Sequence, residues 1–235
     1  MRILLVAATF FEIRPFLDRL PLLAKHNEQL SQYQYQHGTI DVLISGVGMV
    51  PTAYFLGRQL GIQRYDLVIN AGIAGTFNKS LPLGTVVNVV EDCISELGAE
   101  EGENFLSVFE LGLTDPDSDP YKGGRLINIS TESGWLSNNE AVKKLLKVKA
   151  ITSNTIRGNI ESIARIQRIS AAEIESMEGA AFLFACLSEK VSCIQIRSIS
   201  NLVEERDKSR WNLDLSLKNL NKVLWEILTS YTMGG

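Results

Sequence analysis

Residues 176–201 read SMEGAAFLFACLSEKVSCIQIRSISN. The apolar run after Glu178 predicts a buried helix over residues 179–190, and the next apolar run predicts a buried strand over residues 192–198. A carboxylate therefore stands where a helix begins, and the side-chain amide of Asn201 stands just after a strand. Because α/β sheets gather such positions at one edge, we expect both side chains to face a single cleft.

Outside this segment, apolar runs bounded by glycine continue to alternate with helical patterns, which is typical of a buried sheet covered by helices. At 235 residues and 45% hydrophobic content, the chain can bury the core of one α/β domain spanning residues 1–235. We predict strands at residues 3–8, 39–45, 67–71, 85–97, 149–153 and 192–198. We predict helices at residues 13–20, 51–61, 138–146, 160–169, 179–190 and 213–231.

The composition argues against several classes of function. A net charge of −4 with mixed signs disfavours a nucleic-acid groove and attraction to anionic membranes. The three cysteines lie in apolar runs and read as reduced core residues of a cytoplasmic protein. Both histidines lie in polar stretches, so we expect neither a zinc site nor a cofactor. The apolar runs are all shorter than the roughly 20 residues that a membrane span requires.

Glu12 follows the first predicted strand, at the edge of the sheet where α/β proteins bind ligands. An acid at the start of a helix is also ordinary macrodipole chemistry, and position alone favours that structural role. The glycine-rich segments 45–48 and 70–75 follow two further strands and let the backbone approach a ligand closely. Neither matches G-x-G-x-x-G, so a dinucleotide fold is disfavoured, but together they indicate a shared cleft.

Arg197 lies in the predicted strand 192–198, among apolar residues. A buried charge is costly unless it is paired, so we expect an ion pair with Glu12 or another acid of the cleft, or a purely structural pair. The carboxylate of Glu178 suits a sugar hydroxyl, and the amide of Asn201 suits the edge of a 6-oxopurine. With Glu12, these groups suggest hydrolysis of an N-glycosidic bond.

Together these motifs resemble those of the nucleoside phosphorylase/nucleosidase family and, within it, the futalosine hydrolases. The resemblance covers nearly the whole chain. It implies a three-layer αβα sandwich with a mixed central sheet, assembled as a homodimer or larger oligomer. It also implies that a purine nucleoside, futalosine, is hydrolysed to hypoxanthine and dehypoxanthine futalosine in menaquinone biosynthesis.

The resemblance further implies roles for individual residues. Glu12 matches a glutamate that orients or deprotonates the attacking water, and Glu178 matches one that binds the ribose hydroxyls. Asn201 stands where the departing base is contacted. The resemblance places six more residues around the substrate: Ile73, Ala74, Gly75, Ile156, Met177 and Arg197.

Two departures separate the chain from neighbouring groups of that family. Phosphorylases carry a Gly-Asp-Pro-x-Arg-type phosphate loop after the first strand, where this chain has Thr9-Phe10-Phe11-Glu12. A carboxylate at this position repels phosphate and can activate water. Methylthioadenosine/S-adenosylhomocysteine nucleosidases place an aspartate where this chain has Asn201, and commonly an aromatic residue near Ile156. The amide of Asn201 can donate to a 6-oxo group. An adenine-releasing nucleosidase and a non-catalytic nucleoside-binding module are the alternatives.

Two further features carry open alternatives. Residues 113–125 predict a turn-rich loop near the mouth of the pocket, where Lys122 and Arg125 would meet the carboxyphenyl end of the substrate. A mobile solvated loop is the equal alternative. Trp211 reads as part of a helix core, with an aromatic wall for the substrate as its alternative.

Overall fold

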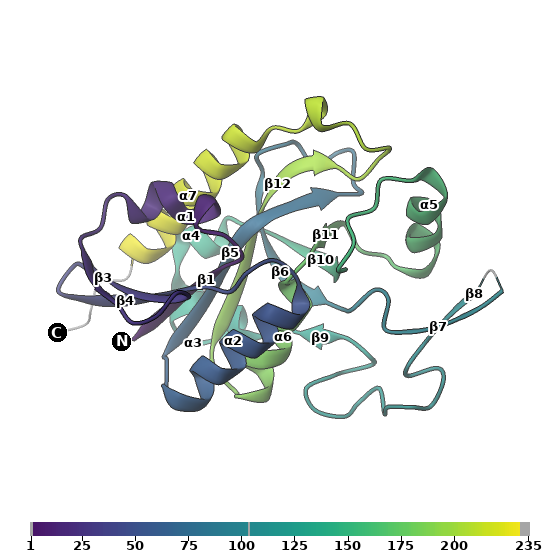
Figure 1. Ribbon diagram of the computed structural model, residues 1–235, viewed down its shortest axis with the longest axis horizontal. Helices are drawn as coiled ribbons and strands as arrows, with labels where there is room; N and C mark the ends of the chain where they lie inside the picture. Colours follow the sequence, from purple (N-terminus) through teal and green to yellow (C-terminus); the bar gives the residue numbers. More distant parts are fainter. Residues whose placement is uncertain (1, 103, 231–235) are drawn as a thin grey trace.

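A mixed β-sheet forms the centre of the molecule in the computed structural model, which describes residues 2–102 and 104–230 (Figure 1). Its strands are β1 (Ile3–Ala7), β2 (Leu22–Lys25), β3 (Leu30–Tyr35), β4 (Gly38–Ile44), β5 (Leu67–Thr76), β6 (Val86–Asp92), β9 (Leu126–Ile127), β10 (Leu146–Thr152), β11 (Ile174–Ser176) and β12 (Cys193–Leu202). They follow the order β11–β10–β6–β12–β5–β1–β4–β3–β2, and β9 pairs with β6. β12, β5, β1 and β4 run parallel, whereas β6 and β3 run antiparallel to their neighbours β12 and β4.

One short strand closes part of this sheet upon itself. β11 pairs with β10 on one side and with the far end of β5 on the other, so β5, β11, β10, β6 and β12 form a ring of strands. A separate hairpin of β7 (Gly98–Glu101) and β8 (Asn104–Ser107) projects from the body (Figure 1). The ring brings residues of β5, β11 and β12 side by side at the end of the sheet where the site lies.

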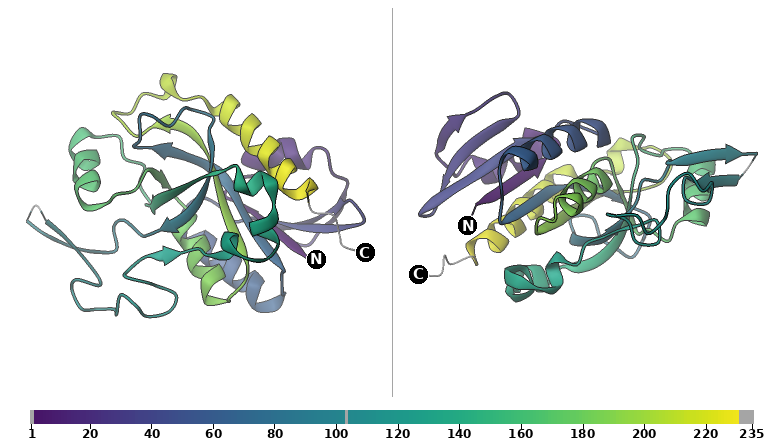
Figure 2. Two further views of the ribbon diagram at one scale, coloured as in Figure 1. Left: turned by 180° about the vertical axis from the view of Figure 1, so that it is seen from behind. Right: turned by 90° about the horizontal axis from the view of Figure 1, so that it is seen from below.

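Helices cover both faces of the sheet (Figure 2). On one face lie α1 (Phe10–Leu17), α7 (Leu213–Thr229) and the short helices α3 (Gly134–Asn138) and α4 (Glu140–Lys143). On the other face lie α2 (Met49–Ile62) and α6 (Gly179–Ser188). α5 (Ile160–Ile169) lies to the side, between β10 and β11 in the sequence. The expected αβα sandwich with a mixed central sheet is confirmed.

The core is divided by the sheet, because successive residues of a strand point to opposite faces. In β5, Val68 belongs to the same core cluster as Leu56 of α2 and Phe182 of α6, whereas its neighbour Ile69 belongs to the cluster of Phe16 of α1. These side chains are fully or almost fully buried. Burial of a large aliphatic or aromatic side chain is worth about 1.5–3 kcal/mol, so both layers stabilise the same strand.

Several element boundaries differ from the predictions. α1 begins three residues earlier than expected, because the carboxylate of Glu12 bonds back to the backbone of Thr9 at its N-terminus. The predicted helix 138–146 is shorter than expected: α4 covers only Glu140–Lys143, with Asn139 as its cap, and β10 has begun by Leu146. The predicted strand 85–97 ends at Asp92. α5 matches the predicted bounds, while Tyr231, expected to end the last helix, lies outside the described residues.

Candidate active site

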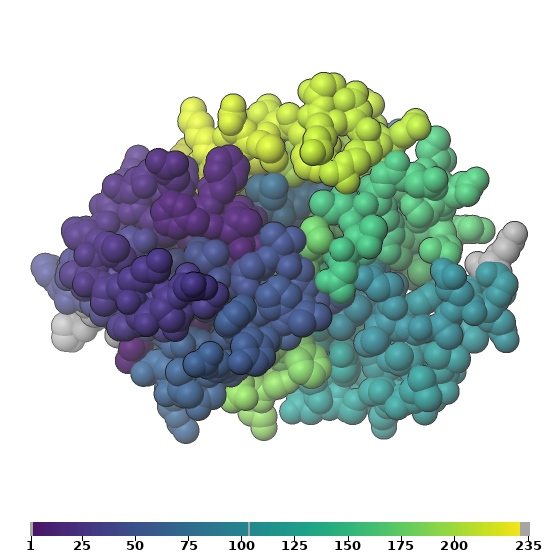
Figure 3. Space-filling view, viewed as in Figure 1, coloured from purple at the N-terminus to yellow at the C-terminus, as the bar shows by residue number. Residues whose placement is uncertain are grey.

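A cavity of about 280 Å³ lies at the carboxyl ends of β1, β5 and β12. The segments that line it meet near the middle of the face shown in Figure 3. Eight of the nine residues predicted for the site line this cavity: Glu12, Ile73, Ala74, Gly75, Ile156, Met177, Glu178 and Asn201. Residues separated by up to 189 positions in the sequence, from 12 to 201, are thus brought together.

Glu12 is fixed by three donors at the start of α1. Its Oε2 accepts from the backbone N–H of Thr9 at 2.9 Å and from the Thr9 hydroxyl at 3.2 Å, while its Oε1 accepts from the N–H of Ile73 at 3.2 Å. Burial raises the pKa of the Glu12 carboxyl and nearby Glu178 raises it further, against the opposing effect of Arg197. The helix-start contact is therefore present, and the same carboxylate is suited to take a proton from water.

Glu178 turns its carboxylate away from the helix that it precedes. Its Oε1 accepts from the backbone N–H of Gly48 at 2.9 Å, and no cap bond to α6 forms. Gly48 adopts φ 97°, a conformation that glycine reaches without strain, and this orients its N–H towards the carboxylate. The glycine-rich segment after β4 thus positions an acid from another layer.

The side-chain amide of Asn201 has a defined orientation in β12. Its nitrogen donates to the carbonyl of Leu202 at 2.9 Å, and its oxygen accepts from the hydroxyl of Ser200 at 2.8 Å. Because a carbonyl only accepts, the atom beside Leu202 is the NH₂ group. The NH₂ retains a second proton and the oxygen a second lone pair. Both remain available to a base in the cavity.

Arg197 does not line the cavity, and its expected partner was wrong. It is buried on β12 opposite Gly72, and its guanidinium donates to the side-chain oxygen of Asn70. Among the described residues, no carboxylate oxygen lies within 4.0 Å of it, so it forms no ion pair with Glu12. A Cβ built on Gly72 would lie 2.8 Å from Arg197 Nη1 and 2.9 Å from Glu12 Oε1. Gly72 thus separates the two charges, which interact through it at longer range.

Sequence reasoning missed Glu175, which also lines the cavity. It sits in β11, a strand too short to give a sequence signal, and its only clue is an acid beside apolar Ile174 before the S-M-E motif. Its Oε2 lies 3.3 Å from Arg157 Nη1. Burial raises the pKa of Glu175, while Arg157 opposes the rise.

Trp211 agrees with the alternative given for it, a wall of the cavity, and not with the helix core that was expected. It lies between β12 and α7 and lines the cavity. The guanidinium carbon of Arg206 lies over its ring, 5.8 Å from the ring centre. It is therefore an aromatic wall rather than part of a helix core.

The 113–125 loop lies elsewhere in this chain. None of the described lining residues comes from it. Arg125 instead lies 3.1 Å from the sulfur of Cys93 and 3.9 Å from Glu91. Within one chain, its two cations, Lys122 and Arg125, do not line the cavity that contains Glu12 and Asn201.

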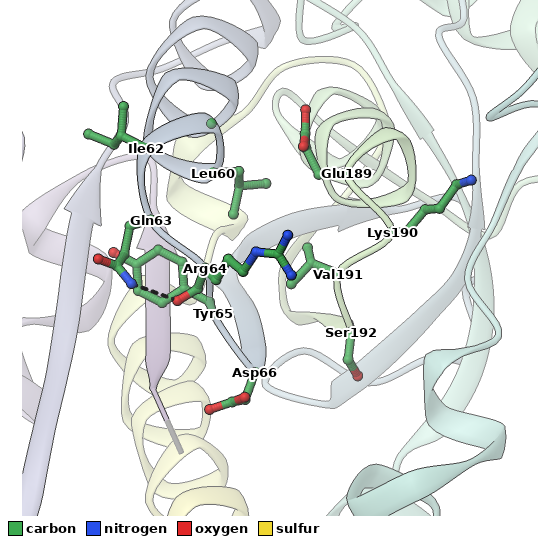
Figure 4. Close-up of a pocket in the computed structure, with 11 residues that line it drawn as sticks. Leu60, Ile62, Gln63, Arg64, Tyr65, Asp66, Glu189, Lys190, Val191 and Ser192 are labelled. Atoms are coloured by element: carbon green, nitrogen blue, oxygen red, sulfur yellow. Dashed lines mark hydrogen bonds between the residues drawn. The ribbon is translucent and has the colours of Figure 1, made fainter.

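A larger hollow of about 740 Å³ lies at the opposite ends of the strands (Figure 4). It is lined by the ends of α2 and α6 and by the residues that lead into β5 and β12, such as Tyr65 and Ser192. None of the predicted site residues lies there. Parallel sheets bind ligands at the carboxyl ends of their strands, so we assign the site to the smaller cavity.

The described residues contain no group of His, Cys, Asp and Glu side chains arranged to hold a metal ion. Over the same part of the chain, no helix has the length and apolar character needed to cross a membrane.

Comparisons with known proteins agree with this geometry. The sequence profile of the Phosphorylase superfamily matches residues 2–229. The futalosine hydrolase of Streptomyces coelicolor is 27% identical over 193 residues, covering 80% of this chain and 77% of that protein. The solved futalosine hydrolase of Helicobacter pylori strain 26695 superposes with a TM-score of 0.78 at 17% identity, covering 98% of both chains. A solved 5′-methylthioadenosine/S-adenosylhomocysteine nucleosidase from Neisseria meningitidis superposes with a TM-score of 0.76 at 20% identity, covering 98% of this chain and 99% of that chain.

Proposed function

The chain belongs to the Phosphorylase superfamily, and we propose that it is an N-glycosyl hydrolase that cleaves futalosine into hypoxanthine and dehypoxanthine futalosine. Superfamily membership leaves open whether water or phosphate attacks the nucleoside. The choice rests on the walls of the cavity.

The charge of the cavity wall is the observation that carries the proposal. Within the described residues, the wall includes Glu12, Glu175 and Glu178 but no lysine or arginine. A phosphate would therefore meet three carboxylates and no lining cation, and this repulsion is stronger in a protein cavity than in bulk water. Water carries no such cost, so this wall favours hydrolysis over phosphorolysis.

The same carboxylates fit the course of the reaction. Water attacks C1′ of the ribose as the bond from C1′ to N9 breaks, and the base leaves with the bonding electron pair. Glu12 accepts the proton that water loses, which its raised pKa favours. Glu178 holds the ribose hydroxyls and stabilises the positive charge that develops on the sugar.

Asn201 provides for the departing base. The departing base takes up a proton at N7 from solvent; the free N–H of Asn201 can donate to O6 of hypoxanthine, and its oxygen can accept from that N7–H. Ser200 and Leu202 hold the amide in one orientation, so little reorganisation is required as charge develops on the base. The leaving group is therefore a 6-oxopurine in this proposal.

Incubation with three nucleosides tests the function. The purified protein is supplied separately with futalosine, inosine and methylthioadenosine, and the released base is identified by chromatography. We expect hypoxanthine from futalosine without added phosphate, and no acceleration when phosphate is present. Release of adenine alone would select an adenine-releasing nucleosidase, and survival of every nucleoside after long incubation would select a binding module.

Two further properties belong to the proposal. The likeness to this family supports assembly as a homodimer or larger oligomer. A cytoplasmic location is part of the proposal and is supported by Cys93, Cys186 and Cys193, all of which are free thiols.

A further inference from the structure

Glu175 has an unpaired oxygen at the edge of the cavity. The side chain lines the cavity but is only 5% exposed, and its Oε1 has no hydrogen-bond partner among the described residues. The other oxygen is occupied by Arg157 Nη1 at 3.3 Å. A buried acceptor without a partner is unusual, because it has lost its hydrogen bonds to water and gained none in the protein. The arrangement points to a donor that arrives with the ligand.

One glycine relates Glu175 to Asn201. In the ring of strands, Gly75 of β5 pairs with Glu175 of β11 on one side and with Asn201 of β12 on the other. Paired residues on neighbouring strands share a face of the sheet, so both side chains rise on the same side of Gly75. With strands about 4.8 Å apart, the two backbones are separated by roughly 10 Å. Glu175, Gly75 and Asn201 all line the cavity, so a flat ligand bound there can meet both polar side chains.

The absence of a side chain at Gly75 lets neighbouring side chains approach its backbone closely. A Cβ there would lie 3.1 Å from the amide nitrogen of Asn201 and 2.9 Å from Val203 Cγ2. The amide of Asn201 is therefore held close against the backbone of Gly75, and Gly75 lines the cavity together with Glu175 and Asn201.

The edge of a purine then decides what each group binds. In a 6-oxopurine, O6 and N7 lie on the side that Asn201 would address, and N1 carries a hydrogen and is a donor on the adjacent side. In a 6-aminopurine, N1 has no hydrogen and is an acceptor. An ionised carboxylate only accepts, so it matches the first base and repels the second.

We propose that Glu175 accepts a hydrogen bond from N1–H of the 6-oxopurine and, together with Asn201, selects that base over 6-aminopurines. Glu175 is thus a specificity-determining residue that reads the edge of the base Asn201 does not reach. The inference rests on the proposed function of the cavity. Arg157 acts behind it as a positioning residue, because its charge and its bond to Ser95 Oγ at 3.1 Å hold the carboxylate in place.

The first test needs no variant. Wild-type protein is titrated with hypoxanthine and with 1-methylhypoxanthine by calorimetry, since the methyl group removes the N1 hydrogen and leaves O6 and N7 unchanged. A charge-assisted hydrogen bond lost in this way should weaken binding by about ten- to a hundredfold. Equal affinity for the two bases would overturn the inference.

The second test exchanges the carboxylate. Glu175→Gln keeps the shape and an acceptor for Arg157, but its amide N–H can donate to N1 of a 6-aminopurine. We expect kcat/KM for futalosine to fall about tenfold or more, while that for its 6-amino analogue holds or rises. Equal losses on both substrates would mean that Glu175 only supports the fold.

Glu96→Gln is the matched control. Glu96 faces the same Arg157 at 3.9 Å, is 41% exposed, and does not line the cavity. Its loss should leave the ratio of the two substrates unchanged, because it removes a charge beside Arg157 without touching the base. A ratio that shifts equally in both variants would assign the effect to Arg157 rather than to Glu175.

These outcomes distinguish a failure of the proposed function from a failure of the role proposed for Glu175. If wild-type protein releases no hypoxanthine from futalosine, the proposed function fails and this inference fails with it. If futalosine is hydrolysed but 1-methylhypoxanthine binds as well as hypoxanthine, only the role of Glu175 is lost.

Discussion

Replacement of Gly72 by alanine should damage catalysis without adding any polar group. The new Cβ would lie 2.8 Å from Arg197 Nη1 and 2.9 Å from Glu12 Oε1. Ordinary carbon contacts begin near 3.5 Å, so each charged group must retreat by about 0.6 Å. Both side chains are buried, and Glu12 is held by three donors, so the carboxylate cannot simply turn into solvent.

The size of the effect follows from this displacement. A shift of about 1 Å in a reacting group can cost about a hundredfold, so we expect kcat to fall about ten- to a hundredfold. Overpacking should destabilise the protein by about 1–3 kcal/mol, which lowers Tm by about 2–12 °C in a chain of this size. Futalosine binding should change less than kcat, because Gly72 itself does not line the cavity.

The assay combines steady-state hypoxanthine release with thermal unfolding of the same samples. Gly57→Ala in α2 serves as the control, since a Cβ there would meet no atom within 4 Å. Its removal of a helix-interior glycine should leave turnover unchanged and stabilise the fold by about 0.5–1 kcal/mol. Near wild-type turnover in Gly72→Ala would refute the idea that this glycine sets the position of Glu12.

Three other substitutions test the proposed roles. Glu12→Gln should lower kcat about 10²–10⁴-fold and leave nucleoside binding largely intact. Because burial and Glu178 raise the pKa of Glu12, wild-type kcat/KM should increase as pH rises through that pKa, above the usual carboxyl range. The variant should lose this rise at acidic pH. Wild-type-like turnover of the variant would exclude Glu12 as the general base. Glu178→Gln should weaken both binding and turnover, and a 2′-deoxy substrate that reacts with wild type as fast as the ribonucleoside would exclude its grip on that hydroxyl. Asn201→Asp should lose activity on futalosine and gain relative activity on the 6-amino analogue, with a cost on the order of 1–3 kcal/mol for the mismatched base; an unchanged ratio of kcat/KM would show that Asn201 does not read the base.

The sequence predicts the elements with a strong local signal. The helix predicted at residues 160–169 agrees with α5, in which an apolar stripe repeats at helical spacing and Asn159 caps the first turn. α6 was found from its apolar run. The parallel strands at the centre were found because they are buried on both faces and read as continuous apolar runs.

The missed elements are short or half exposed. β2 and β3 lie at the edge of the sheet and carry mixed polar residues, and β11 has only three residues. Their existence depends on pairing with strands distant in the sequence, which no local pattern reports. Glu175 was missed for the same reason, since its meaning depends on Gly75, 100 positions earlier.

The candidate site was predicted better than its supporting contacts. Glu12, Glu178 and Asn201 follow strands or begin helices, positions that a parallel sheet brings to one edge. The partner of Arg197 could not be found this way, because Asn70 and Glu12 are both plausible acceptors until the register of β5 and β12 is known. Charge alone favoured Glu12 as the partner of Arg197, but the guanidinium donates to the side-chain amide of Asn70 instead.

The contacts that hold Glu12 also make the site observable without substrate. Its oxygens accept from the backbone amides of Thr9 and Ile73, one in the turn before α1 and the other in β5. Protonation weakens a carboxylate as an acceptor, so hydrogen–deuterium exchange at these two amides should accelerate as Glu12 gains its proton. The ionisation of the proposed base can therefore be followed by amide NMR in the resting protein, two residues serving as its internal indicator.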